Sequence, residues 1–135
     1  DSAASNNSLN LFDEMRSAAL LAKLASQDAS ALSAAEALHM ATLGGARALG
    51  LEEQIGSLEQ GKLADLIAVD LTGPETQPLY NPLSQLVYAC NGSQVTHSWI
   101  AGQLRLRDRQ LQGLDLAAIA SRSQYWQQRI TGQQQ

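Results

Sequence analysis

The spacing of apolar residues changes at Gly50, and this change divides the chain into two parts of different secondary structure. Before Gly50, apolar side chains recur every three or four residues, which is typical of amphipathic helices. After Gly50 they form short runs separated by glycine and proline, which is typical of strands and turns. The order of these patterns predicts a helical layer followed by a small sheet.

Two helices are expected before Gly50. Asn10 is placed to cap a helix that runs to about Ser26. Residues 33–36, Ser-Ala-Ala-Glu, have the form of a capping box and predict the start of a second helix. The glycine pair at 44–45 is expected to interrupt this helix, and Gly50 is expected to end its last turn.

Three strands are expected after Gly50, at residues 64–70, 95–101 and 104–107. All three prolines lie in a predicted loop over 71–82, and Pro82 can begin a short helix. Three strands make a poor sheet unless another segment extends them. The pattern therefore indicates that strands from outside this sequence complete the sheet.

A last helix is expected after Asp115, which can cap it. Leu116, Ile119, Ala120, Ser123 and Gln127 fall on one face of this helix.

The composition excludes several classes of protein. Lys and Arg number 9 against 13 Asp and Glu, and a net charge of -4 offers no electrostatic surface for nucleic acid. No apolar stretch is long enough to cross a membrane, and residues 1–10 lack the basic start of a signal peptide. Cys90 is the single cysteine and is interpreted as a small core residue. A soluble, cytoplasmic protein is expected.

Residues 56–62, Gly-Ser-Leu-Glu-Gln-Gly-Lys, match the first seven positions of a phosphate-binding P-loop. Position 63 is Leu, whereas a P-loop has Ser or Thr there to hold magnesium. The segment also follows a predicted helix and precedes a predicted strand, which is the reverse of the P-loop order. We interpret the two glycines as tight turns.

The remaining chemically active side chains are interpreted as structural. His39 has no second His or Cys at helical spacing, and His97 lies within a predicted strand. Asp65 precedes a strand and is expected to bind backbone N–H groups of a turn. Trp99 and Trp126 are interpreted as core or interface residues.

Asp1 is followed by small polar side chains at 2–7, and such a loop lets a ligand approach the backbone closely. The chain does not begin with Met. We therefore expect it to be a processed chain or a piece of a longer protein.

Several segments together resemble one enzyme family. Residues 56–66 resemble the Gly-x-x-x-x-Gly-Lys-x-Ala-Asp-Leu signature near the carboxyl end of the amidohydrolase superfamily. Residues 41–50 and 95–103 look like the last helices and the final hairpin of that family. Residues 1–12 are similar to the Gly-Thr-Asp-Gly-Ala-Ala-Ser-Asn-Asn loop of its chlorohydrolase and aminohydrolase branch, and most similar to 5-methylthioadenosine/S-adenosylhomocysteine deaminases. The resemblance extends to about residue 120.

The resemblance implies an α/β fold, a metal-dependent (β/α)8 barrel with a small composite β-sandwich. Residues 1–50 would be the last loop and closing helices of the barrel. Residues 51–112 would be the carboxyl-terminal part of the sandwich, and 113–135 a terminal helix and tail. The amino-terminal strands of the sandwich would lie in a missing part of the same polypeptide.

The resemblance also implies a hydrolase that deaminates an adenine nucleoside, methylthioadenosine or S-adenosylhomocysteine, to the inosine analogue and ammonia. Asp1 matches the family position that ligates a divalent metal, commonly zinc, and shuttles protons, although Ser2 stands where many relatives have Gly. The other metal ligands are expected outside this chain, because it has no His-x-His pair and neither histidine falls at a ligand position. No substrate-binding residue is predicted.

Two alternatives stay open. The chain could belong to another member of the branch, such as a triazine chlorohydrolase or a guanine deaminase, or act as a non-catalytic assembly module. The expected partners are the nucleoside, water, the missing amino-terminal part and a second copy in a homo-oligomer, with no nucleic acid and no membrane. The 135 residues alone are expected to be inactive.

Overall fold

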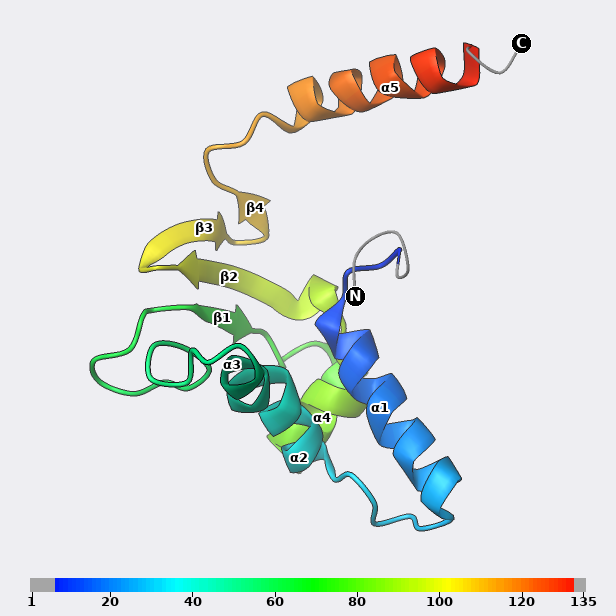
Figure 1. Cartoon of the computed structure of the whole chain (residues 1–135), viewed down its shortest axis with the longest axis vertical. Coiled ribbons are helices and arrows are strands. Elements are labelled where there is room, and N and C mark those ends of the chain that lie inside the picture. The colour runs from blue at the N-terminus through cyan, green and yellow to red at the C-terminus, as the bar shows by residue number, and fades with distance from the viewer. Residues whose placement is uncertain (1–6, 133–135) are drawn as a thin grey trace.

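The structure is a computed structural model that describes residues 7–132. Helices α1, α2 and α4 form one layer, a four-stranded antiparallel sheet lies beside them, and a last helix stands apart (Figure 1). The main helices are α1 (Leu11–Ser26), α2 (Ala34–His39), α4 (Pro82–Tyr88) and α5 (Leu116–Gly132). The strands are β1 (Leu66–Val69), β2 (Val95–Ile100), β3 (Gln103–Arg107) and β4 (Gln110–Leu111).

The predicted caps of the first two helices are confirmed. The Asn10 side chain accepts a hydrogen bond from the Phe12 amide at 3.2 Å, which satisfies a free N–H group at the start of α1. Ser33 and Glu36 form a reciprocal capping box at α2, in which Glu36 Oε2 accepts from the Ser33 amide at 2.7 Å. Local sequence alone fixes where these helices begin.

The predicted break at Gly44 and Gly45 is wrong. The helix continues from α2 through a π-helical turn, η1 (Met40–Gly44), into α3 (Gly45–Ala48). A Cβ at Gly44 would lie 3.1 Å from the carbonyl oxygen of His39, so a residue without a side chain suits this wide turn. The helix ends at Gly50, which has φ +68° as expected.

The three predicted strands are confirmed: β1 and β2 are shorter than predicted, whereas β3 begins one residue earlier, at Gln103. The sheet order is β1-β2-β3-β4. The fourth strand was missed because β4 has two residues, too few to show an alternating pattern. Asp108 and Arg109, with φ of +48° and +63°, form the turn that places β4 against β3. Strand β1 is an edge strand of the described sheet.

The core lies between α1, α2 and α4, on the side of the helices that faces β1 and β2. Its buried members come from three helices and from the second residue after α4: Phe12, Met15, Ala19, Ala37, Val87 and Cys90. Cys90 is fully buried, which confirms the core interpretation, and burial raises the pKa of its thiol. No helix within residues 7–132 is long and apolar enough to cross a membrane.

Candidate functional site

Asp1, the one predicted catalytic and metal-binding residue, lies outside the described residues. What the structure does describe is the element that follows its loop. Leu9 adopts φ +46°, Asn10 caps α1, and the side-chain Nδ2 of Asn10 donates to Asp13 Oδ2 at 2.8 Å. The amino end of α1 therefore has a defined conformation directly after the predicted site loop.

Arg16 fastens α1 to the end of α4. Its Nη2 and Nε donate to the carbonyl oxygens of Cys90 and Val87, at 2.5 and 3.3 Å. These carbonyls lie at the carboxyl end of α4, where a cation is favourable. Arg16 also pairs with Asp13 at 3.7 Å. One side chain thus fixes the helix that carries the predicted site loop.

An apolar groove of about 560 Å³ lies between α1, α2 and β1. Its lining includes Phe12, Met15, Leu38 and Leu66, and its one carboxylate is Asp65. Asp65 Oδ1 accepts the Ala101 amide at 2.6 Å, which confirms the predicted turn-binding role. The groove therefore has the character of a packing surface rather than of a polar reaction site.

The glycine loop at 56–62 is structural, as predicted. Lys62 Nζ donates to Ser57 Oγ at 2.6 Å and lies 3.5 Å from Glu59 Oε1, so its ammonium group is engaged within the loop. The Ser57 hydroxyl and the Lys62 charge lower the pKa of Glu59. A loop whose lysine is engaged in this way, and which is followed directly by strand β1 rather than by a helix, is not a phosphate cradle.

The two histidines are not brought together. His39 is exposed at the end of α2, whereas His97 lies in β2 with its ring stacked on Trp99 at a centroid distance of 5.6 Å. His97 Nε2 lies 3.5 Å from Asp108 Oδ1 across the sheet. Neither histidine belongs to a group of three or more possible metal ligands among the described residues.

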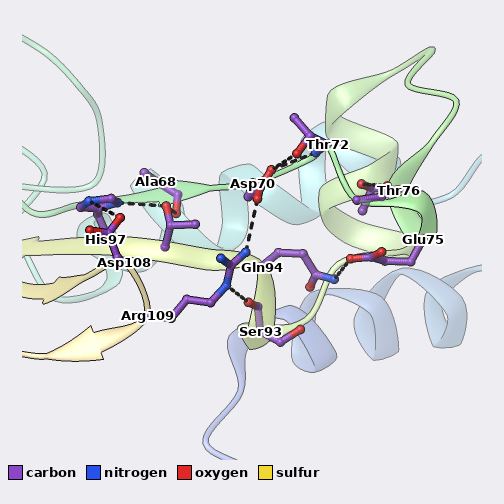
Figure 2. A network of polar contacts seen from close by, with 12 residues as sticks. Ala68, Asp70, Thr72, Glu75, Thr76, Ser93, Gln94, His97, Asp108 and Arg109 are labelled. Atoms are coloured by element: carbon purple, nitrogen blue, oxygen red, sulfur yellow. Dashed lines mark hydrogen bonds and ion pairs between the residues drawn. The ribbon is translucent and has the colours of Figure 1, made fainter.

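A polar cluster at one end of the sheet was not predicted (Figure 2). Arg109, in the turn between β3 and β4, donates from Nε to the Ser93 carbonyl at 2.9 Å and pairs through Nη2 with Asp70 at 3.3 Å. Asp70 also accepts from the Thr72 hydroxyl at 2.6 Å and the Thr72 amide at 3.0 Å. The Thr72 bonds and the Arg109 guanidinium lower the pKa of Asp70. We call these four residues the Asp70–Arg109 cluster.

A buried glutamine extends this cluster toward the proline-rich loop. Gln94 is 5% exposed, and its Nε2 donates to Glu75 Oε1 at 3.1 Å. Its Oε1 accepts the Asn91 amide at 2.9 Å. Asp70 and Arg109 are 39 positions apart, so no local pattern in the sequence could have revealed their contact. The paired charges indicate a structural clamp rather than a reaction centre.

A metal site is not formed by the described part of the chain. Residues 7–132 hold no group of three or more His, Cys, Asp or Glu side chains that could bind a metal ion. A zinc site needs at least three protein ligands. The described residues therefore do not fit a metal on their own, and the predicted ligand, Asp1, is outside them.

Residues 1–105 match the sequence profile of the amidohydrolase family. The chain belongs to the amidohydrolase family. The resemblance seen in the sequence is thus confirmed, and the helices and antiparallel sheet are those of a carboxyl-terminal amidohydrolase segment.

Two curated amidohydrolase relatives are named 5-methylthioadenosine/S-adenosylhomocysteine deaminase. The protein of Teredinibacter turnerae is 47% identical over 130 residues, which are 96% of this chain and 29% of the relative. That of Syntrophobacter fumaroxidans is 48% identical over 125 residues, or 93% of this chain and 28% of the relative. The chain thus spans less than a third of the length of these relatives.

Solved amidohydrolase structures show the same fold. A zinc-bound adenosine deaminase from Xanthomonas campestris is 53% identical, with a TM-score of 0.94, and the match covers 98% of this chain and 30% of that one. The zinc-bound atrazine chlorohydrolase TrzN from Arthrobacter aurescens is 30% identical, with a TM-score of 0.82, over 92% of this chain and 28% of that one.

Proposed function

We propose that this chain is the carboxyl-terminal part of a metal-dependent amidohydrolase that deaminates an adenine nucleoside, giving the inosine analogue and ammonia. The main support for this proposal is the 47% identity over 130 residues to a relative named 5-methylthioadenosine/S-adenosylhomocysteine deaminase. The proposed substrates are methylthioadenosine and S-adenosylhomocysteine, and water is the second reactant.

Asp1 is the residue of this chain that we propose acts in the reaction. A divalent metal, with zinc favoured by its presence in the solved relative, lowers the pKa of water so that a nucleophile exists near neutral pH. The Asp1 carboxylate would hold the metal, accept a proton from the attacking water and pass it to the leaving amine. The remaining ligands would come from the amino-terminal part of the polypeptide.

The capped and anchored α1 supports this role. A catalytic carboxylate has to be held to within about 0.5 Å and 10–20° of its productive position. Asn10 and Arg16 fix the helix that begins ten residues after Asp1, through bonds to Phe12 and to the end of α4. We therefore propose Asn10 and Arg16 as positioning residues for the Asp1 loop.

The proposed division of the chain follows the exposed apolar surfaces. Residues 1–50 would close a barrel, because α1 leaves Leu20, Leu21 and Leu24 more than half exposed. Residues 51–112 would be half of a sandwich, because β1 is an edge strand and the apolar groove runs beside it. Residues 113–135 would form the terminal helix and tail.

The second candidate is a triazine chlorohydrolase, favoured by the match to TrzN at a TM-score of 0.82. Its 30% identity is lower than the 53% identity to the adenosine deaminase, so we place deamination first. A guanine deaminase and a non-catalytic assembly module are placed after these two. The mass of the gene product separates the module from the enzyme: about three times that of this chain supports the enzyme.

The test is an Asp1→Ala substitution in the protein as its gene encodes it. We expect ammonia release from methylthioadenosine to fall by about 10²–10⁴-fold or more, because the proton-transferring carboxylate and a metal ligand are lost together. Asp28→Ala is the matched control, since Asp28 is exposed in the loop after α1. A kcat near the unmodified value in the Asp1 variant would remove this residue from the mechanism.

A further inference from the structure

Helix α5 has an apolar stripe that no described residue covers. Leu116, Ile119, Trp126 and Ile130 are 57, 48, 48 and 61% exposed. With Ser123 they alternate at spacings of three and four residues, which aligns them along one side of a helix. Every residue of α5 is exposed in the described structure. A stripe of this kind on a soluble protein marks a contact surface.

The position of α5 cannot be explained by contacts within this segment. A connection of residues 112–115 links β4 to α5. Helix α5 projects away from the sheet and the helical layer (Figure 1). A lone helix of 17 residues in water is marginally stable. Asp115 caps it through a bond from the Ala118 amide at 3.0 Å, but this bond does not orient the helix.

The solved adenosine deaminase keeps α5 in this position. The alignment covers 98% of this chain at a TM-score of 0.94, and α5 contributes 17 of the 135 residues. So high a score over so much of the chain requires α5 to superpose with the rest. A projecting helix that holds one orientation in both structures is held by a surface outside the matched segment, and 70% of the solved chain lies there because the match covers 30%.

We propose that α5 docks, through its Leu116–Ile119–Trp126–Ile130 stripe, onto the amino-terminal part of its own polypeptide. This inference rests on the proposed function in one respect, namely that such an amino-terminal part exists. The contact would tie the last helix of the chain to the part of the protein that precedes Asp1.

The charges of α5 define the surface that it fits. Its residues include Arg122 and Arg129 and no Asp or Glu. The Arg129 guanidinium lies 5.3 Å from the Trp126 ring centroid and 5.7 Å from that of Tyr125, and its Nη1 donates to the Tyr125 hydroxyl at 3.0 Å. These contacts order Trp126 of the stripe and Tyr125 next to it in the chain. The receiving surface is therefore an apolar groove with carboxylates at its rim.

A second copy and a membrane fit less well. The short connection after β4 holds α5 close to its own chain, so an intramolecular site has a high effective concentration. Leu20, Leu21 and Leu24 of α1 also need a cover, and one amino-terminal body can supply both. Membrane-surface helices are rich in cations, whereas the polar residues of α5 are mainly Gln, Ser and two Arg.

The test is hydrogen–deuterium exchange of the α5 amides in the protein as its gene encodes it. We expect α5 to be protected, and the protection to be independent of protein concentration over about two orders of magnitude. Ile119→Asp should raise α5 exchange rates by about tenfold or more. Ser121→Asp is the matched control, because it adds the same charge two residues away on the opposite side of the helix and should leave α5 protected.

Three results would overturn the docking. They are α5 exchange at the rate of an unfolded chain, protection that appears only as copies associate, and protection that appears only with vesicles of anionic phospholipid. Ammonia release is measured on the same sample, so that the two proposals fail separately. A protected α5 in an inactive protein contradicts the proposed function alone, and an exposed α5 in an active deaminase contradicts the docking alone.

Discussion

Gly56 has both a positive φ and closely packed neighbours. Its φ is +90°, and a Cβ built there would lie 2.7 Å from Ala46 Cβ and 2.9 Å from Leu43 Cα. Gly61 has a similar φ of +97° but no atom within 4 Å of a Cβ. A side chain at Gly61 would therefore meet only the unfavourable backbone conformation, whereas a side chain at Gly56 would also overlap with neighbouring atoms.

Gly56→Ala should destabilise the fold more than Gly61→Ala. We expect about 2–4 kcal/mol for Gly56, because a positive φ and overpacking both contribute, and about 1–2 kcal/mol for Gly61, where conformation alone contributes. Urea unfolding of the protein as its gene encodes it gives both values. Equal losses at the two positions would contradict the packing explanation.

Asp70 should make stability depend on pH. Its pKa in the folded state lies below the ordinary value near 4, so its stabilising contribution is fully present above that value. The contribution is lost as the pH falls through the lower, folded-state pKa. Asp70→Asn should therefore lower the urea midpoint near neutral pH, and the difference should shrink in acid. The exposed Glu53→Gln serves as control, and an Asp70→Asn deficit that stays constant with pH would rule out this linkage.

At the scale of elements, the fold depends on how α1 meets α4. The apolar side chains Phe12 and Met15 pack against Val87, and Arg16 adds hydrogen bonds to two α4 carbonyls beside them. Apolar burial has no direction, whereas the hydrogen bonds fix the rotation of α1 about its axis. The two kinds of contact together hold the amino end of α1 in place.

Arg16→Met should test this arrangement, because it keeps the long apolar stem and removes both hydrogen bonds. We expect a loss of about 1–3 kcal/mol of unfolding free energy, the usual value for hydrogen bonds from a charged group. Arg47→Met, at an exposed position of α3, should change stability by less than about 0.5 kcal/mol. If α1 positions the Asp1 loop, the Arg16 variant also loses deaminase activity while the Arg47 variant does not.

At the scale of the whole molecule, much apolar surface of this chain remains uncovered. Leu11, Leu58, Ile67 and Tyr80 are all exposed by more than half, in addition to the α5 stripe. Leu11, Leu58 and Ile67 line the same groove, and a contiguous apolar surface of this kind is typical of a contact site. The chain spans less than a third of its relatives, and their further length is the natural source of the missing cover.

The isolated 135 residues should therefore release no ammonia from methylthioadenosine, even with added zinc. The reason is that residues 7–132, which the structure describes, contain no group of three or more His, Cys, Asp or Glu side chains that could bind a metal ion. The matched positive control is the complete gene product under the same conditions. Turnover by the isolated chain would show that it contains a whole active site.

The sequence by itself determined the features that depend on near neighbours. Asn10, Ser33 and Gly50 mark helix ends through bonds or φ values that involve only a few residues, and the caps and the αL stop are found as predicted. The motif at 56–66 indicated the family, and the positive φ of its two glycines, Gly56 and Gly61, is a local backbone feature. The role of Asp1 also came from a local motif and stays a prediction, since Asp1 lies outside the described residues.

Only the tertiary structure showed the contacts between residues that are far apart in the sequence. The contact between Asp70 and Arg109 spans 39 positions, and the pairing of β4 follows from a turn with positive φ, so neither left a periodic pattern. The helix continues through Gly44 in a π-helical turn, where a Cβ would lie only 3.1 Å from the His39 carbonyl oxygen, so a residue without a side chain suits this position. The residue type of Trp126 suited either a core or an interface position. Its exposure on a projecting helix shows that it does not belong to the core of this segment. Local bonds act over a few residues, whereas these outcomes require distant parts of the chain to meet.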